Sequence, residues 1–476
     1  MKFKHRTRMT LLALLATAII FACSAVGSAP TEVPPPPPPT DTPVPAEPTA
    51  EPILEPTATL EPVVESTEAP TETPITSGEE IITIDQVHGF YDIYDALNVV
   101  GLVTNDTSRV IDNVELEVEI FDANDVSLYM ETIYIDLFAL APGETSPFSL
   151  YIFDDLPEAD SFVATVVGNS VTDLERAILD VGNSLMTFDD DGNIHITGEL
   201  FNNTDQPVDI NALAAAVFDA NGEIVASDSY NTTIRYLDPG DSGPFRVTIT
   251  GPDSGTADIS NFQVYIDSEF TDPIAPFNIT IGDAYNYLDT FDNLHLVGQV
   301  TNNSDTTWNV RMVAGIYDAE GNVLDAAYVD LPINALAPGA SSPYDFDFWG
   351  PLASTTGLFD LADSYSIQVD AYWTWENDTE LIDLTTANDT NEFGSFGGTF
   401  TGQVVNNSGG PVDGAVIVIY MTDNETGEIV AMGDAYLLDE IADGGSVDYT
   451  VYIDPEEGYD INSAQHFIIV KAERLQ

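Results

Sequence analysis

Cysteine is almost missing from this chain of 476 residues, because Cys23 is the only one. A single thiol excludes an internal disulfide, so the folded part must take its stability from apolar cores alone. It also excludes a zinc site built from cysteines and histidines together. Hydrophobic residues make up 44% of the chain, which is enough for several ordinary cores.

Basic residues are the second shortage. The chain has 11 Lys and Arg against 80 Asp and Glu, and four of the 11 stand in the first eight positions. The remainder therefore carries 11 − 4 = 7 basic residues and a formal charge of 7 − 80 = −73. Such a field repels phosphate backbones and anionic lipid, which excludes a nucleic-acid partner and favours cations or basic partners. Solubility outside the cell or in a salty habitat is the simpler explanation of the acidity.

The N-terminus has the pattern of an export signal. A basic opening precedes Leu11 to Ala22, a run of twelve uncharged residues, whereas a spanning helix needs about 20 apolar residues. The run ends in Ile20-Phe21-Ala22-Cys23, which resembles a bacterial lipobox. That resemblance implies a signal peptide at 1–22, a lipidated Cys23 as the mature N-terminus, and a location on the outer face of a bacterial membrane. The alternative is cleavage elsewhere, for example after Gly27, with Cys23 as a free thiol.

A proline-rich segment follows, which we assign to residues 23–79. Fifteen of the 30 prolines fall between Pro30 and Thr76, among Thr, Glu, Ala and Val. Because proline fixes φ and removes a backbone donor, neither helix nor sheet is expected here. A polyproline II chain of this length would reach roughly 140 Å at about 3.1 Å per residue. We expect a disordered stalk that lifts the folded part from the membrane, with threonines that would permit O-glycosylation.

The rest of the chain repeats a pattern about every 100 residues. The first marker is Gly-x-[Val/Leu]-x-Asn, at Gly101–Asn105, Gly198–Asn202, Gly298–Asn302 and Gly402–Asn406. The second marker ends in aspartate, at Phe121-Asp122, Phe218-Asp219, Tyr317-Asp318 and Thr422-Asp423. The third is Leu-x-Pro-Gly, at Leu140–Gly143, Leu237–Gly240 and Leu336–Gly339, and altered at Ile441–Gly444. Four copies result, at 80–170, 171–272, 273–377 and 378–476.

The markers and the segments between them predict short antiparallel strands. Asn105 and its equivalents should end a strand and bond the backbone of a polar turn. From Val114 to Ile120 apolar residues alternate with glutamates, which is typical of a half-buried strand. The matching stretch of the fourth copy, Ala415 to Tyr420, is apolar throughout, so both of its faces should be covered. Pro-Gly suits the centre of a type II turn. The pattern favours four tandem antiparallel β-sandwiches with almost no helix.

These residues resemble a known family. The Gly-x-Val-x-Asn strand, the aromatic-Asp ending and the Leu-x-Pro-Gly turn followed by Pro-Phe are similar to the bacterial FxLYD-type domains. The resemblance covers about residues 80 to 476 and is weaker in the fourth copy. It implies immunoglobulin-like sandwiches in a secreted protein or lipoprotein of the cell envelope. It implies no catalytic residues.

Motifs for catalysis are missing. The sequence has no Gly-x-Ser-x-Gly elbow, no phosphate loop and no dinucleotide fingerprint. His195 and His295 hold the same place, three residues before the marker glycine, where the other copies have Asn98 and Thr399. A position that accepts such different residues is expected to be an exposed strand site. We therefore expect neither an enzyme nor a cofactor.

An acidic segment in the second copy, Asp189-Asp190-Asp191-Gly192-Asn193, looks like the start of a calcium loop. The twelfth position of an EF-hand loop starting at Asp189 would be Leu200, where that motif needs Glu. The simpler prediction is a turn between the first two strands of the copy. Weak calcium binding through Asp189, Asp191 and Asn193 is the alternative.

All four tryptophans lie in the third copy, and Trp373 and Trp375 fall on one face of an expected strand. Exposed aromatic rings form platforms for sugars and peptides, but tryptophan is more often buried in a core or a junction. We expect a non-catalytic, lipid-anchored surface protein in which a stalk carries a rod of sandwiches for display, adhesion or protein interaction. The alternative is a carbohydrate- or solute-binding lipoprotein that acts through Trp373 and Trp375. A surface protein or a glycan is the expected partner.

Overall fold

The computed structural model describes residues 81–474 apart from 154–155, 231–232, 257, 275–277, 349–356, 372–373, 395–396, 457–458 and 461–462. The predicted signal peptide and stalk lie outside these residues, so both stay predictions. Twenty-nine strands and one short helix, α1 (Leu358–Leu361), make up the regular structure of the described part. No helix in that part is long and apolar enough to cross a lipid bilayer.

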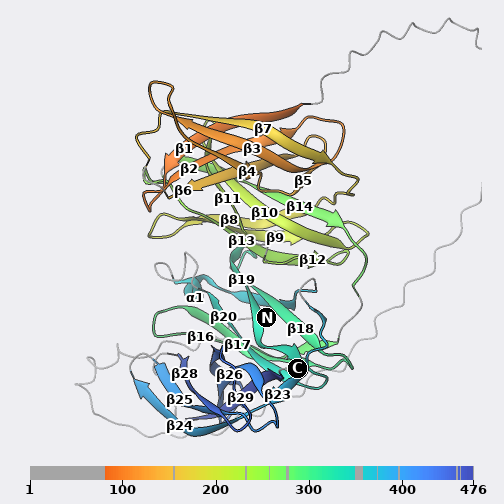
Figure 1. The fold of residues 1–476 in the computed structure, drawn as a ribbon, viewed down its shortest axis with the longest axis vertical. Coiled ribbons are helices and arrows are strands. Elements are labelled where there is room, and N and C mark those ends of the chain that lie inside the picture. The colour runs from red at the N-terminus through yellow and green to blue at the C-terminus, as the bar shows by residue number, and fades with distance from the viewer. Residues whose placement is uncertain are drawn as a thin grey trace, which may run out of the picture. The chain divides into compact units, whose positions relative to one another are not determined.

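The first copy shows the plan of all four (Figure 1). Its strands are β1 (Ile82–Tyr91), β2 (Leu97–Asn105), β3 (Ile111–Phe121), β4 (Ser127–Tyr134), β5 (Ala139–Leu140), β6 (Thr145–Ile152) and β7 (Ser161–Val171). One sheet has the order β1-β2-β6, and in the other β3 pairs with β4, β5 and β7. Side chains of both sheets meet in one apolar cluster, so the copy is a β-sandwich.

The second copy repeats this arrangement with β8 (Asp180–Phe188), β9 (Ile194–Phe201), β10 (Val208–Asp219), β11 (Ile224–Tyr230), β12 (Tyr236–Leu237), β13 (Ser242–Ile249) and β14 (Ile259–Phe270). Its sheets are β8-β9-β13 and the strands around β10. The third copy has β15 (Ile279–Ile281), β16 (Tyr285–Leu288), β17 (Leu294–Asn302), β18 (Trp308–Tyr317), β19 (Val323–Leu336), β20 (Ser341–Phe348), β21 (Ser364–Val369) and β22 (Trp375–Glu376). Its sheets are centred on β17 and β18.

The fourth copy comprises β23 (Leu381–Asp383), β24 (Thr385–Gly394), β25 (Gly397–Val405), β26 (Val412–Asp423), β27 (Ile429–Leu437), β28 (Ser446–Ile453) and β29 (Ala464–Arg474). They form the sheets β24-β25-β28 and β23-β29-β26-β27. The protein is thus all-β, and its described residues hold eight antiparallel sheets that are consistent with about four β-sandwich domains.

The predicted alternation in β3 is confirmed. Val114, Leu116, Val118 and Ile120 are each no more than 1% exposed, and they belong to the core of the first sandwich. The glutamates between them, Glu115, Glu117 and Glu119, are only partly buried. This sheet therefore has one apolar face inside the sandwich and one polar face in solvent.

Strand β10 has no polar face, because both of its faces are packed. Its alternate residues divide between two apolar clusters: Leu213, Ala215 and Val217 join the core of the second sandwich, and Ala212, Ala214 and Ala216 join that of the first. Strand β11 of the same sheet contacts β2 and β6 of the first sandwich. The apolar clusters therefore continue from one copy into the next.

The fourth copy confirms the expectation that both faces of Ala415 to Tyr420 are covered. Ile417, Val418 and Ile419 are fully buried, although successive residues of a strand point to opposite faces. Tyr285 and Ile333 of the third sandwich belong to the same apolar cluster. One face of this sheet thus packs on its own sandwich and the other on the preceding one.

The marker asparagines are structural anchors in all four copies. Each is fully buried: Asn105, Asn202, Asn302 and Asn406. The side-chain nitrogen of Asn202 donates to Gln206 O and to Leu237 O, each at 2.9 Å, and its Oδ1 accepts from the backbone N and the hydroxyl of Thr204. The other three copies repeat these bonds. The predicted bonding of the turn backbone is confirmed, and the amide also ties the turn to a distant strand.

The Pro-Gly turns need glycine for its backbone conformation. Gly143, Gly240 and Gly339 have φ of +83°, +86° and +75°, as the third position of a type II turn requires. In the fourth copy Asp443 replaces the proline, but Gly444 keeps φ at +73° and the turn still closes with Gly445 N donating to Ala442 O. The altered marker therefore preserves the turn.

Candidate functional site

Cys23 and Trp373, which the sequence analysis singled out, fall outside the described residues. Lipidation and the aromatic platform therefore stay predictions. Of Trp375 only the backbone is described: it lies in β22, paired with Asn309 of β18. Trp308 begins β18, is half-buried, and donates from its ring nitrogen to the hydroxyl of Ser304 at 2.8 Å. The described tryptophan therefore supports the turn after Asn302.

The acidic segment at 189–193 joins β8 to β9 as a turn. Asp189 Oδ1 accepts from the backbone N of Asn193 at 2.8 Å, and Oδ2 accepts from Asn193 Nδ2 at 2.9 Å. Asp191 is exposed. Within the described residues, no group of three or more His, Cys, Asp or Glu is placed to hold a metal ion. Calcium binding at Asp189, Asp191 and Asn193 stays a prediction, and both oxygens of Asp189 already accept hydrogen bonds.

The expectation that His195 and His295 are exposed strand sites is wrong. They are 6% and 8% exposed, and Asn98 at the equivalent place is 7% exposed. Each stands on the outer face of the three- or four-stranded sheet that contains the marker glycine. In the first three copies the next sandwich covers that face. Thr399, in the last copy, is only partly buried. Burial by a neighbouring sandwich, which one repeat alone does not reveal, is the physical reason.

These contact regions between successive sandwiches form the candidate site, and we call them the first, second and third joints. Across the first joint, Asp267 of β14 is 1% exposed. Its Oδ2 accepts from the backbone N of Ala139 in the first sandwich at 2.8 Å, and its Oδ1 pairs with the guanidinium of Arg176. Arg176 also approaches Glu144 of the first sandwich. The buried carboxylate of Asp267 thus contacts residues of both sandwiches.

The first joint also brings two acids together. Asp136 follows β4, and Asp228 lies in β11 on the other side. Burial and the charge of Asp228 raise the pKa of Asp136 well above its usual value. Burial raises the pKa of Asp228 to about 6. The hydroxyl of Ser149 reaches Asp136 Oδ1 at 3.4 Å, while Oδ2 of Asp136 is buried with no partner. Burial and the like charge of Asp228 therefore favour the protonated form of Asp136.

The second joint contains an ion pair with a buried acid. Arg246 Nη1 of β13 lies 2.6 Å from Asp325 Oδ1 of β19, and Asp325 is 1% exposed. The hydroxyl of Thr197 donates to the backbone carbonyl of Val323 beside this pair. Leaving either charge unpaired in such a place is strongly destabilising.

A second acid of the same joint, Asp370, is fully buried and accepts from the backbone N of Arg235 at 3.4 Å. Arg311 of β18 lies with its guanidinium carbon 3.5 Å from the ring centroid of Tyr328. Burial lowers the pKa of Arg311, and Asp370 is the strongest opposing charge. The second joint therefore places charged groups from both sandwiches next to one another.

The third joint is centred on His295 of β17. Its Nδ1 lies 2.9 Å from Asp345 Oδ1, and its Nε2 lies 3.5 Å from Asp289 Oδ2 and 3.7 Å from Asp347 Oδ1. The ring stacks on Tyr287 with centroids 4.9 Å apart. Burial would lower the pKa of His295, but Asp345 and the other two carboxylates raise it to about 10. The three carboxylates therefore favour the protonated imidazole.

Hydrogen bonds connect this cluster to the fourth sandwich. The hydroxyl of Tyr287 donates to the backbone carbonyl of Asp454 at 3.0 Å, and the hydroxyl of Thr290 donates to Asp454 Oδ2 at 2.8 Å. Tyr285 donates to Glu456 Oε2 at 2.6 Å. The third joint is thus polar near His295 and apolar around Ile333.

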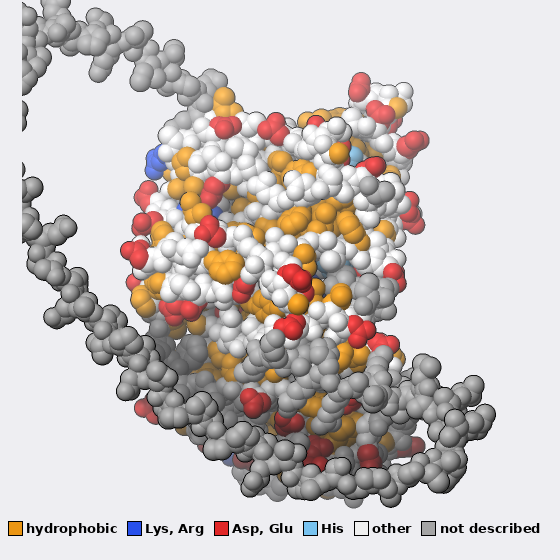
Figure 2. Space-filling model, turned by 180° about the vertical axis from the view of Figure 1, so that it is seen from behind, with side chains coloured by type: hydrophobic (Ala, Val, Ile, Leu, Met, Phe, Trp, Pro, Cys, Tyr) orange, Lys and Arg blue, Asp and Glu red, His pale blue; other side chains and the backbone are white. Residues whose placement is uncertain are grey.

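Basic residues concentrate at the joints. The face in Figure 2 shows many acidic side chains on the described surface and very few basic ones. Of the seven Lys and Arg in the described part, four lie at the first two joints: Arg176, Arg235, Arg246 and Arg311. Sequence reasoning missed these joint residues. The scarcity of Lys and Arg was the available signal. In a chain with so few cations, each one is a candidate partner for a buried carboxylate.

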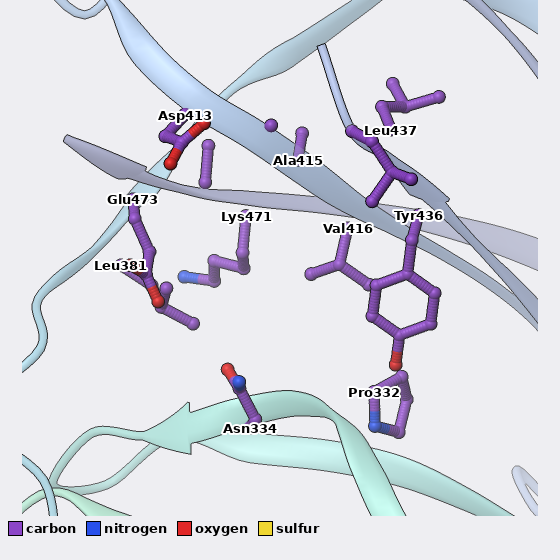
Figure 3. Close-up of a pocket in the computed structure, with 13 residues that line it drawn as sticks. Pro332, Asn334, Leu381, Asp413, Ala415, Val416, Tyr436, Leu437, Lys471 and Glu473 are labelled. Carbon is purple, nitrogen blue, oxygen red and sulfur yellow. The ribbon is translucent and has the colours of Figure 1, made fainter. Parts of the chain in front are cut away.

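A cleft of about 360 Å³ opens at the third joint (Figure 3). Pro332 and Asn334 of β19 form one wall. The opposite wall belongs to the fourth sandwich and contains Leu381, Asp413 to Val416, Tyr436 to Leu438 and Lys471 to Glu473. Lys471 Nζ lies 2.6 Å from Asp383 Oδ1. The cleft combines an aromatic ring, aliphatic side chains and groups of both charges.

Comparison with known proteins assigns the chain to no family. No model of a protein family matches the chain, and no curated protein matches it. Among solved structures, Escherichia coli alpha-2-macroglobulin in its native conformation is a weak match, with 9% identity, 81% of this chain covered and a TM-score of 0.12. This chain spans 28% of the length of that protein. Recombinant pro-11S globulin of pumpkin matches with 11% identity over 63% of this chain and 85% of its own, at a TM-score of 0.08. Scores this low carry no argument about function.

Proposed function

We propose that this protein is a non-catalytic, lipid-anchored protein of the bacterial cell surface. Its tandem sandwiches, of the immunoglobulin-like FxLYD type, present a coupled surface for display, adhesion or protein interaction. Cys23 carries the anchor, and the segment from Pro30 to Thr76 is the stalk.

The observation that carries the proposal is the construction of the joints. Independent domains on a flexible string need no buried charge between them, whereas Asp267, Asp325 and His295 are each buried at a joint and paired. Coupled sandwiches lose little conformational freedom when a partner contacts two of them at once. Most of the few cations in the described residues stabilise contacts between sandwiches. Sandwiches held together in this way are suited to presenting a large fixed surface.

The anchor is tested by fractionating a bacterial host that expresses the full chain. We expect the wild type in the membrane fraction and a Cys23→Ser variant in the medium, with a diacylglyceryl cysteine at the N-terminus of the wild type by mass spectrometry. Ser24→Ala is the matched control and should stay with the membrane. Retention of Cys23→Ser in the membrane fraction would refute the anchor.

The surface role is tested with whole cells. Protease added outside the cell should release fragments of the sandwiches from the wild type, and deletion of residues 30–76 should shield them. A strain without the gene should adhere less to neighbouring cells or to a coated surface. Unchanged adhesion, together with protection of the wild-type protein from external protease, would contradict the proposal.

A further inference from the structure

We propose that the cleft at the third joint binds a neutral saccharide of one or two sugar units. The described residues that line it come from both the third and the fourth sandwich. Domain interfaces are frequent places for small-molecule sites, because two rigid walls supply groups from different directions.

One difference from the first joint lies at the position of Asp267. Asp267 pairs with Ala212 across β14 and β10, and Lys471 pairs with Val416 across β29 and β26. Ala212 and Val416 both lie 14 residues after their marker glycines, so the two positions correspond. At the first joint the carboxylate reaches across to a backbone N–H of the preceding sandwich. A lysine side chain cannot accept a hydrogen bond from a backbone N–H, so Lys471 cannot form the equivalent contact. The third joint has a cleft beside Lys471.

The walls of the cleft carry the groups that recognise a sugar. Tyr436 is 60% exposed, and large aromatic side chains in that state offer a flat apolar face for the C–H groups of a sugar ring. Lys471 and Asn334 project into the cleft from opposite walls, with Asp413 and Glu473 beside them (Figure 3). Lysine donates, carboxylates accept, and the amide does both, which matches hydroxyl groups that donate and accept at once.

The charges decide in favour of a neutral ligand. Lys471 is already paired with Asp383, and Asp413 and Glu473 add two more negative charges to the lining. An anionic ligand would meet three carboxylates against one paired ammonium group. A cationic ligand would have to lie against Lys471. A polyhydroxylated neutral molecule avoids both penalties, and the volume of about 360 Å³ suits one or two sugar rings.

The test is calorimetric titration of the detergent-solubilised full chain with maltose, cellobiose and N,N′-diacetylchitobiose. Glucuronic acid and glucosamine serve as charged comparators. We expect binding of at least one neutral disaccharide, weakened about tenfold or more by Tyr436→Ala, which corresponds to about 1.4 kcal/mol. Asp413→Asn should weaken it as well. Tyr452→Ala, which removes a 73% exposed tyrosine of β28 outside the cleft, is the matched control and should bind as the wild type does.

Three outcomes overturn the proposal. Binding of none of the three disaccharides excludes it. Binding that survives both Tyr436→Ala and Asp413→Asn, or that is lost only with Trp373→Ala, places the sugar elsewhere. Tighter binding of glucuronic acid or glucosamine refutes the charge argument. Circular dichroism and the melting temperature show that each variant is folded, so loss of binding reports on the cleft. None of these outcomes depends on whether Cys23 is lipidated.

Discussion

The marker asparagines show how one side chain organises a turn in each copy. Asn202 uses both amide hydrogens and both acceptor sites of its carbonyl oxygen on the chain around it. With Thr204 it also forms an Asn-x-Thr sequence, which matches the acceptor pattern for N-glycosylation. Because Asn202 is fully buried and its nitrogen already donates twice, the pattern is structural at this position.

Replacing this asparagine should destabilise the second sandwich. Asn202→Ala leaves the buried Leu237 O and the partly buried Gln206 O and Thr204 N without their partner. A buried group left unsatisfied costs about 1–3 kcal/mol. We expect a loss of about 3 kcal/mol or more in urea unfolding. Asn203→Ala, at the exposed next residue, should change the free energy by less than about 0.5 kcal/mol. Equal effects of the two substitutions would show that the hydrogen bonds of Asn202 do not stabilise the sandwich.

His295 should stabilise the third joint in a pH-dependent way. The surrounding carboxylates raise its pKa to about 10 in the folded protein, against an ordinary value of 6.5. A raised pKa means that the stabilisation is fully present below about pH 6.5 and is lost as the pH rises through about 10. His295→Gln should therefore lower the melting temperature most at pH 6 to 7, with a loss on the order of 3 kcal/mol. His466→Gln, at an exposed histidine, is the control, and a pH-independent effect of His295→Gln would argue against this role.

At the scale of strands and sheets, each joint is built from a sheet with two packed faces. The outer face of the first sandwich has glutamates on β3, and β28 of the last sheet exposes Asp448, Thr450 and Tyr452. Strands β10 and β26, which lie within joints, have apolar residues on both faces. Sheets with a polar outer face are what repeat arrays need at their ends.

The ion pair of the second joint should behave as a buried pair. Arg246→Ala leaves Asp325 buried and unpaired, which costs about 3–5 kcal/mol, whereas Arg246→Met with Asp325→Leu should recover most of that loss. Chemical denaturation of the two single variants and the double variant forms a cycle that measures the coupling. Additive effects of the single substitutions would mean that the two side chains do not interact.

The acid pair of the first joint should have the opposite pH dependence from a salt bridge. Burial raises the pKa of Asp228 from 3.8 to about 6. The stability linked to this group is therefore full below about pH 4 and falls as the pH rises to about 6. Asp228→Asn should raise stability by about 2 kcal/mol at pH 7 and have little effect at pH 4. Asp258→Asn, at an exposed site, is the comparison; a loss of stability at pH 7 in Asp228→Asn would reverse the argument.

The strands and turns could be predicted from the sequence because their causes are local. Alternation placed β3, asparagine placed the turns, and Gly143 and its equivalents fixed the bends. The joints could not be predicted from the sequence in this way, because the neighbouring copy determines which face of a sheet is covered. His295 looked exposed for that reason, although it lies among carboxylates. The alanines of β10, which replace the alternating glutamates of β3, are the sequence feature that could have indicated the covered face. The platform of Trp373 and Trp375, the calcium loop and Cys23 remain predictions from sequence.

At the scale of the whole molecule, the charge of the chain opposes its own compactness. Most carboxylates have no basic partner in the described residues, so the folded part repels itself, and the repulsion is screened by salt. We expect the melting temperature to rise by several degrees between about 0.02 and 0.5 M sodium chloride. Calcium chloride at matched ionic strength separates screening from binding: a much larger rise with calcium would reveal a specific site. No rise with either salt would contradict the role of self-repulsion.

The two-faced sheets also impose a direction on biogenesis. On the proposed export from the N-terminus, the first sandwich emerges with the polar face of β3 already in solvent. The outer face of the β1-β2-β6 sheet is then still uncovered, and β10 and β11 cover it after β8 and β9 have emerged. A fragment that starts at the second sandwich would instead leave the apolar face of β10, with Ala212, Ala214 and Ala216, without the first sandwich that covers it.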